Sequence, residues 1–257
     1  MDKALLVVSF GTSYPETRER TIGAIEQKLA EAFPDRTVRR AWTSSFLIKK
    51  VAKAEGLAID TPEEALEKLA AEGACDVIVQ PTHLSDGYEN QRLLEIVRYF
   101  AGRFENVTVG RPLLSTAADR EAVAQLMPEL CLDGADGKAL LLMGHGSDKH
   151  PVPVYEQLQE AFAKTSDKVF VGTVEGTPTF EDAKARLDES GCREVVLAPL
   201  MIVAGDHAVN DLAGDKDSWK NRLEAAGYDT EVVLKGLGEY PQIRDMFVKH
   251  AAEAEAI

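Results

Sequence analysis

Cysteine is scarce in this chain, and long hydrophobic runs are absent. The 3 cysteines among 257 residues are widely spaced and form no CxxC pair, so nothing indicates a zinc ribbon or a thioredoxin-type redox site. No apolar stretch approaches the roughly 20 residues that a membrane-spanning helix needs. The opening segment MDKALLVVSFGTS has no small-residue cleavage site, and we interpret it as a first strand rather than a signal peptide. We therefore expect structural thiols and a cytoplasmic location.

Positive charge is also in short supply. The chain has 29 Lys and Arg against 43 Asp and Glu, which gives a formal net charge of −14. This excess of negative charge disfavours nucleic acid as a partner, because the phosphate backbone would be repelled. It leaves a small anionic ligand open, since a local basic region can oppose the net charge.

Several nucleotide-binding and hydrolase motifs are missing. There is no GxxxxGK[ST] loop, which argues against ATP-driven action, and no GxGxxG after the first strand, which disfavours a nicotinamide cofactor. Neither a GxSxG nucleophile elbow nor an HExxH motif occurs. The chemistry must therefore come from another constellation of residues.

Short apolar runs alternate with longer segments of helical period, in a chain that is 45% hydrophobic. This pattern is typical of an α/β protein with parallel sheets covered on both faces. The expected strands are 4–9, 37–42, 76–81, 107–110, 139–144, 169–174, 194–202 and 230–235. The expected helices are 15–32, 61–72, 90–103, 117–130, 153–164, 179–190, 216–226 and 240–254.

The chain contains a similar half twice. Segments 61–81 and 179–199 align without a gap at an offset of 118 positions, as from Thr61 to Thr179. The opening strand repeats as well, because ALLVVSFGTS from Ala4 resembles ALLLMGHGSD from Ala139. An internal duplication predicts two similar Rossmann-like lobes, each a four-stranded parallel sheet flanked by helices.

The expected lobes are residues 1–130 and residues 138–257. The glycine- and acid-rich segment CLDGADGK, residues 131–138, is the best linker between them. The helix-prone C-terminal segment 240–257 is a candidate to pack back on the first lobe, and we expect its tail to fray.

Three side chains that can bind a metal follow three strands of the second half. His145 follows ALLLMG, Glu175 follows VFVGTV, and His207 follows EVVLAPLMIVAG. Because the carboxyl ends of parallel strands meet at one edge of a sheet, we expect these side chains to converge. Two imidazoles and a carboxylate suit a borderline divalent ion such as Co²⁺, Ni²⁺, Fe²⁺ or Zn²⁺. Imidazole can also accept a proton near neutral pH.

Each of these residues also has a simpler explanation. A histidine after a glycine can cap a helix or bond a carbonyl group, and a glutamate at a strand end is often merely solvated. His207 can pair with Asp206 or Asp211. The corresponding positions of the first half hold other residues, namely Phe10, Ser44 and Glu89. The coincidence of three such residues in one copy favours a single, asymmetric metal site in the second lobe.

Three longer motifs carry a resemblance to a known family: GHGS at 144–147, GTVEGTPTFED at 172–182 and PLMIVAGDHAVNDLAGD at 199–215. With them the chain resembles the anaerobic sirohydrochlorin cobaltochelatases of cobalamin biosynthesis, which are grouped with ferrochelatase as ATP-independent, class II chelatases. The resemblance extends over essentially the whole chain. It implies two α/β lobes with a tetrapyrrole cleft between them.

The resemblance also implies residue roles and partners. By it, His145, Glu175 and His207 bind the metal and assist deprotonation, with Co²⁺ as substrate, Fe²⁺ or Ni²⁺ as alternatives, and no nucleotide. Sirohydrochlorin is the expected partner, without nucleic acid or membrane, and a homo-oligomer stays open. The candidate tetrapyrrole-binding residues are Phe10, Thr12, Ser13, Ser44, Ser45, His83, Leu84 and Glu89.

Other assignments remain open. A His₂Glu zinc hydrolase is disfavoured, because no second catalytic carboxylate is spaced to activate a water. A tetrapyrrole or metal carrier is a non-enzymatic alternative. His83 is expected either at the surface or facing the substrate, and His150 and His250 are expected to be exposed. Core packing is expected for Trp42 and Trp219.

Overall fold

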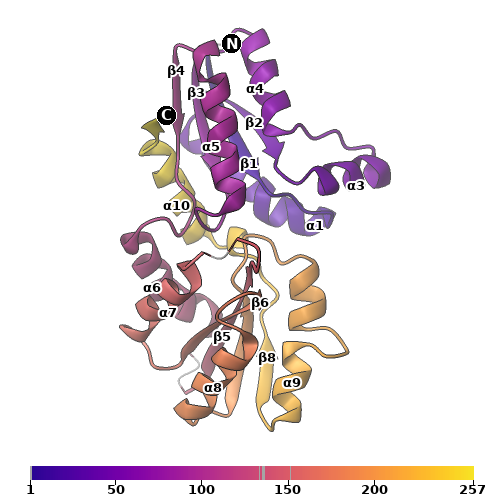
Figure 1. The fold of residues 1–257 in the computed structure, drawn as a ribbon, viewed down its shortest axis with the longest axis vertical. Coiled ribbons are helices and arrows are strands. Elements are labelled where there is room, and N and C mark those ends of the chain that lie inside the picture. Colours follow the sequence, from indigo (N-terminus) through magenta and orange to yellow (C-terminus); the bar gives the residue numbers. More distant parts are fainter. Residues whose placement is uncertain (1, 133, 135–136, 151) are drawn as a thin grey trace. The chain divides into compact units, whose positions relative to one another are not determined.

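The computed structural model describes residues 2–132, 134, 137–150 and 152–257. It divides the chain into two units, which are treated separately below. The first unit is Met1–Ser115 together with Pro241–Ile257, and the second is Thr116–Tyr240. Each unit is an α/β layer structure with its own hydrophobic core, which confirms the predicted fold class (Figure 1).

The sheet of the first unit has the strand order β2-β1-β3-β4-β9. Its strands are β1 (Lys3–Ser9), β2 (Thr37–Trp42), β3 (Asp76–Pro81), β4 (Asn106–Val109) and β9 (Glu255–Ala256). The first four are parallel, and Ala4 to Val8 of β1 are completely buried because helices cover both faces of the sheet.

The fifth strand was not predicted. The tail was expected to be helical and to fray, but the helix before it ends at Ala252, and Glu255 and Ala256 pair antiparallel with Val109 and Thr108 of β4. The edge of a parallel sheet offers unpaired amide and carbonyl groups, and the tail satisfies them. The predicted four-stranded sheet is therefore five-stranded in this unit.

The helices of the first unit match the expected segments, with one exception. They are α1 (Pro15–Arg18), the π-helix η1 (Glu19–Gly23), α2 (Ala24–Ala32), α3 (Ser45–Glu55), α4 (Pro62–Ala71), α5 (Tyr88–Phe100), the 3-10 helix η2 (Ala101–Arg103) and α10 (Pro241–Ala252). Helix α3 was not predicted from the sequence, and in the structure Val51 is its one buried residue.

The second unit has a four-stranded parallel sheet in the order β6-β5-β7-β8. The strands are β5 (Ala139–Gly146), β6 (Val169–Glu175), β7 (Glu194–Pro199) and β8 (Asp229–Val232). The helices are α6 (Ala117–Leu132), α7 (Val154–Ala163), α8 (Phe180–Ser190), the π-helix η3 (Ala208–Leu212), α9 (Trp219–Ala225) and the 3-10 helix η4 (Leu237–Glu239).

The unit boundaries differ from the predicted lobes at both ends. Helix α6 was assigned to the first lobe, but its buried face, which includes Val123 and Met127, packs with α7 and the sheet of the second unit. Of the predicted linker 131–138, residues 133, 135 and 136 lie outside the described residues.

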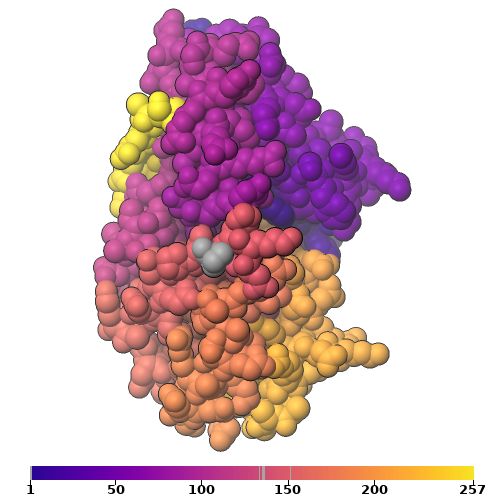
Figure 2. All heavy atoms as spheres, viewed as in Figure 1, coloured from indigo at the N-terminus to yellow at the C-terminus, as the bar shows by residue number. Residues whose placement is uncertain are grey.

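The C-terminal helix α10 belongs to the first unit, where it packs on α2 and β3. Figure 2 shows these last residues, in yellow, beside the magenta and purple segments of that unit. His250 of α10 was expected to be exposed, but it is completely buried and its Nδ1 lies 3.1 Å from the Arg111 carbonyl oxygen. The apolar side of the helix carries His250 into the core together with Phe247.

The duplicated segments start their helices in the same way. Thr61 before α4 and Thr179 before α8 each form a capping box, with Glu64 and Asp182 as the respective acidic partners. In each box the threonine hydroxyl accepts the backbone N–H of the acid, and the acid accepts the backbone N–H of the threonine. Among the described residues, no helix combines the length and apolar character needed to cross a bilayer.

Candidate metal centre

The turn that presents His145 is held by packing around two glycines. Gly144 lies against the buried ring of Tyr155, where a Cβ atom would come 2.2 Å from Cε1. Gly146 has a φ of +74°, which only glycine adopts readily, and its amide donates to the Tyr155 hydroxyl over 3.2 Å. The strand is buried up to Gly144 and His145 is exposed. The two glycines therefore fix the backbone of this turn and leave the imidazole of His145 exposed to solvent.

His207 lies at the start of a short π-helix that follows β7. In η3, Ala208 and Leu212 are buried, and Leu212 belongs to the hydrophobic core of the second unit. The His207 Nδ1 atom lies 2.7 Å from Oδ2 of Asp211. π-helical turns of this kind are rare and are frequently found at functional sites.

The structure brings the two imidazoles together. The ring centroids of His145 and His207 are 4.7 Å apart, and the ring planes are at 89°. His145 Nδ1 lies 2.8 Å from the Gly146 carbonyl oxygen. Since each Nδ1 faces an acceptor, each ring carries its proton there when it is neutral, and each Nε2 keeps a lone pair. The pair thus offers two neutral nitrogen donors, the ligand type that suits cobalt, iron, nickel and zinc.

Both simpler interactions considered from the sequence are present. His145 does contact a carbonyl oxygen, and His207 does pair with Asp211. Neither interaction competes with metal binding, because both occupy Nδ1. Metal-binding histidines commonly use the second nitrogen in this way, and the contact sets the tautomer and the ring orientation.

Glu175 ends the neighbouring strand and is exposed. The parallel register pairs it with Gly146, one position beyond His145. Among the described residues, no group of three or more His, Cys, Asp or Glu side chains is arranged to hold a metal ion. Two of the three predicted ligands are thus adjacent, and the third remains a prediction.

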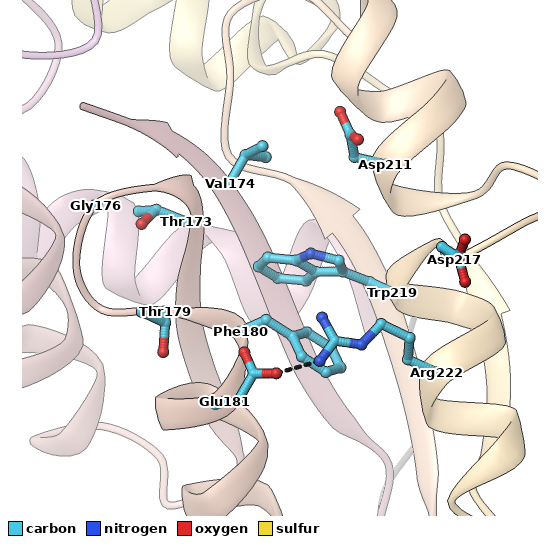
Figure 3. A pocket seen from close by; sticks show the side chains of 10 residues that line it. All are labelled: Thr173, Val174, Gly176, Thr179, Phe180, Glu181, Asp211, Asp217, Trp219 and Arg222. Carbon is cyan, nitrogen blue, oxygen red and sulfur yellow. Dashed lines mark hydrogen bonds and ion pairs between the residues drawn. The ribbon is translucent and has the colours of Figure 1, made fainter. Parts of the chain in front are cut away.

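A pocket of about 340 Å³ lies in the second unit (Figure 3). Its floor is aromatic: Trp219 packs on Phe180 with a centroid distance of 5.0 Å, and the Arg222 guanidinium lies 3.9 Å from the centre of the Phe180 ring. Trp219 is 5% exposed, which confirms its predicted packing role. Asp211, the partner of His207, lines the same pocket. Sequence reasoning identified neither the pocket nor the contribution of Tyr155.

The other predicted substrate residues belong to the first unit. Phe10 follows β1 and is 50% exposed. Thr12 is buried and its hydroxyl accepts the Tyr14 amide at 3.3 Å, whereas the Ser44 hydroxyl caps α3 by accepting the Leu47 amide. Ser45 is exposed in the first turn of α3, and Ser13 and Leu84 are half-buried. Their predicted contacts with a tetrapyrrole remain predictions.

His83 is buried, at 8% exposure, so the surface alternative is wrong, and the substrate-facing alternative remains a prediction. Burial lowers the pKa of its imidazole to about 4, against the opposing effects of the Glu89 charge and the Asn90 side chain. Neither ring nitrogen has a hydrogen-bond partner among the described residues. Glu89, in the first turn of α5, is half-buried, and its Oε2 is equally without a described partner.

Comparison with known proteins gives a consistent set of relatives. The family model described as "Cobalt chelatase (CbiK)" matches residues 3–256. The sirohydrochlorin cobaltochelatase of Salmonella typhimurium is 43% identical over 259 residues, covering 99% of this chain and 97% of that protein. The sirohydrochlorin cobaltochelatase CbiKC of Nitratidesulfovibrio vulgaris is 34% identical over 258 residues, covering 98% and 90%.

Solved structures show the same fold at low sequence identity. SirB from Bacillus subtilis with Fe³⁺ has a TM-score of 0.67 at 16% identity, over 98% of this chain and 95% of that one. The sirohydrochlorin chelatase SirB from Bacillus subtilis subspecies spizizenii, in complex with cobalt, has a TM-score of 0.63 at 16% identity and the same coverage.

Proposed function

Because this chain belongs to the cobalt chelatase (CbiK) family, we propose that it inserts a divalent cobalt ion into sirohydrochlorin, the activity for which its two curated relatives are named. The observation that carries the proposal is the pair of imidazoles at the strand ends of the second unit, 4.7 Å apart, each with Nδ1 engaged and Nε2 left to bind a metal. The ion is a substrate of the reaction and not a resident cofactor.

The proposed ligands are His145, His207 and Glu175. The imidazoles supply neutral nitrogen donors, and the exposed carboxylate offsets part of the charge of the ion once it turns toward them. Fe²⁺ and Ni²⁺ accept the same donor set, so the preference for cobalt rests on the family and on metal availability.

Insertion exchanges two protons for one metal ion. The four macrocycle nitrogens replace the ligands of the ion, while two pyrrole N–H bonds break and their electron pairs pass to nitrogen–cobalt bonds. We assign the proton acceptor to His145, because its Nε2 lone pair becomes free as cobalt leaves it for a pyrrole nitrogen. His145 accepts the two protons one after the other, and Glu175 passes each of them to solvent before the next is taken up. The new nitrogen–cobalt bonds drive the reaction, so no nucleotide is required.

The first unit contributes substrate contacts in this proposal. Phe10, half exposed at the end of β1, supplies an apolar surface for the macrocycle, together with Leu84. The hydroxyl groups of Ser13 and Ser45 are donors for the substrate carboxylates. Thr12 and Ser44 already bond the backbone through their oxygen atoms, but each keeps a hydroxyl proton to donate.

Steady-state kinetics test the proposal. The protein is incubated with sirohydrochlorin and excess Co²⁺ without nucleotide, and the absorbance of the tetrapyrrole is followed. Many equivalents of cobalt-sirohydrochlorin per protein molecule are expected. Product limited to one equivalent would mean a carrier, and no spectral change beyond the uncatalysed rate would contradict the proposal. A parallel series with Fe²⁺ measures the metal preference.

A further inference from the structure

We propose that Asp211 is a positioning residue, which holds His207 in one tautomer and one orientation so that its Nε2 lone pair is available to cobalt. This inference rests on the proposed function, because it concerns the same metal site. It assigns a role to a residue that the sequence offered only as a structural partner of His207.

The hydrogen bond between Asp211 and His207 is short, and buried residues hold the segment that carries it. Oδ2 of Asp211 lies 2.7 Å from His207 Nδ1, within the usual range of a charge-assisted hydrogen bond. Both residues belong to the same short segment, because His207 precedes η3 and Asp211 lies within it. The buried side chains of Ala208 and Leu212 fix that segment to the core. The carboxylate therefore has a defined place relative to the ring.

The tautomer decides whether the ring can bind a metal. A neutral imidazole carries one proton. A proton on Nε2 would remove the lone pair with which this nitrogen can bind a metal ion. A carboxylate at Nδ1 keeps the proton on Nδ1 and also makes Nε2 a better donor. Asp211 performs both tasks, because an ionised carboxylate only accepts hydrogen bonds.

The two imidazoles differ in the partner that holds them. His145 is held by the backbone carbonyl of Gly146, which no substitution of a side chain removes. His207 is held by a side chain that also borders the 340 Å³ pocket (Figure 3). Only one of the two ligands is thus open to a test by mutation of its partner.

The test compares three variants with the wild type. Asp211→Ala removes the acceptor, and Asp211→Asn is isosteric but can bond the ring through either its oxygen or its nitrogen. Asp215→Ala is the matched control, because it removes an exposed carboxylate from the segment that follows η3. Cobalt affinity is measured by calorimetric titration without tetrapyrrole, and nitrogen-15 NMR of the histidines reports which ring nitrogen of His207 carries the proton.

We expect cobalt binding to weaken by about 10- to 100-fold in Asp211→Ala, the usual effect of removing such a partner, and to change less than 2-fold in Asp215→Ala. The NMR spectrum should show Nδ1–H for His207 in the wild type and a mixture of tautomers in Asp211→Ala. For Asp211→Asn, both the cobalt affinity and the share of Nδ1–H tautomer should lie between those of the wild type and of Asp211→Ala. In steady state, KM for cobalt should rise more than kcat falls.

The failure of this inference can be separated from failure of the proposed function. If His207→Ala binds cobalt as tightly as the wild type, His207 is no ligand, and the proposed site is wrong. If His207→Ala loses cobalt while both Asp211 variants keep wild-type affinity and the Nδ1–H form, the positioning role is wrong and the site stands. If Asp211→Ala does not fold, the isosteric Asp211→Asn alone decides by the same two measurements.

Discussion

In both units the first strand, β1 or β5, ends at a glycine turn, but the side chain that the turn presents differs. Gly11 after β1 has a φ of +105° and lies against the buried ring of Trp42, whereas Gly146 at the end of β5 has a φ of +74° and lies against the Glu175 backbone. The residue before each glycine is Phe10 in one unit and His145 in the other. The same glycine turn thus presents an apolar ring in the first unit and an imidazole in the second.

The matching positions Glu89 and His207 also differ between the two units. In the second unit the imidazole of His207 is backed by the carboxylate of Asp211. In the first unit the carboxylate of Glu89, at the matching position, acts on the buried imidazole of His83. The partners do not correspond, because at the offset of 118 positions His83 aligns with Met201 and Asp211 aligns with Leu93.

The largest effect is expected where the units differ most. His145→Ala removes the proposed acceptor and ligand, and kcat for cobalt insertion should fall at least about 100-fold, as for loss of a general base. Phe10→Ala, at the same place in the other unit, should raise KM for the tetrapyrrole and leave more activity. Circular dichroism checks that both variants fold. An equal loss of kcat in the two variants would contradict the different roles assigned to His145 and Phe10.

The next effect concerns the buried imidazole of the first unit. The pKa of His83 is lowered by burial to about 4 from its usual 6.5. Between these pH values the unfolded chain binds a proton that the folded chain does not, so this group lowers the free energy of unfolding as the pH falls. The slope is about 1.4 kcal/mol for each pH unit.

His83→Leu should therefore flatten the pH dependence of stability between pH 6.5 and 4, measured by urea unfolding at several pH values. His150→Gln, at an exposed histidine of the second unit, is the control and should leave the slope unchanged. An unaltered slope in His83→Leu would mean that His83 is already protonated or accessible in the folded state.

A smaller effect on the cobalt dependence of the rate is expected from substitution of Glu175, and none from substitution of Ser44, the matching residue of the first unit. Glu175→Ala should raise KM for cobalt by about 10-fold, because the ion loses its one anionic ligand; this change corresponds to about 1.4 kcal/mol of binding free energy. Ser44→Ala should leave the cobalt dependence alone and lower stability by about 1 kcal/mol through loss of the α3 cap. Unchanged dependence of the rate on cobalt in Glu175→Ala would remove this residue from the ligand set.

Much of the fold could be predicted because its signals are local. The buried strands read as apolar runs, and the capping threonines mark Pro62 and Phe180 as helix starts. Helix α3 and strand β9 were not predicted from the sequence. Helix α3 is mostly exposed and contributes only Val51 to the buried residues, whereas β9 exists only because β4 offers an edge to a distant part of the chain.

The site was predictable only in part. The strand-end positions of His145 and His207 follow from the parallel topology, and the structure brings these rings together. The place of Glu175 relative to His145 cannot be read from the spacing of motifs, because it depends on which residues pair across β5 and β6. The burial of His250 depends on the packing of α10 against α2 and β3, which are remote in sequence.

The central claim is that the two imidazoles bind the metal through Nε2. A crystal soaked in Co²⁺ and measured at the cobalt absorption edge tests it most directly. We expect one anomalous peak about 2.1 Å from Nε2 of both His145 and His207, the usual metal–imidazole distance. A fully occupied cobalt ion elsewhere on the protein, with both Nε2 atoms unbound, would contradict it.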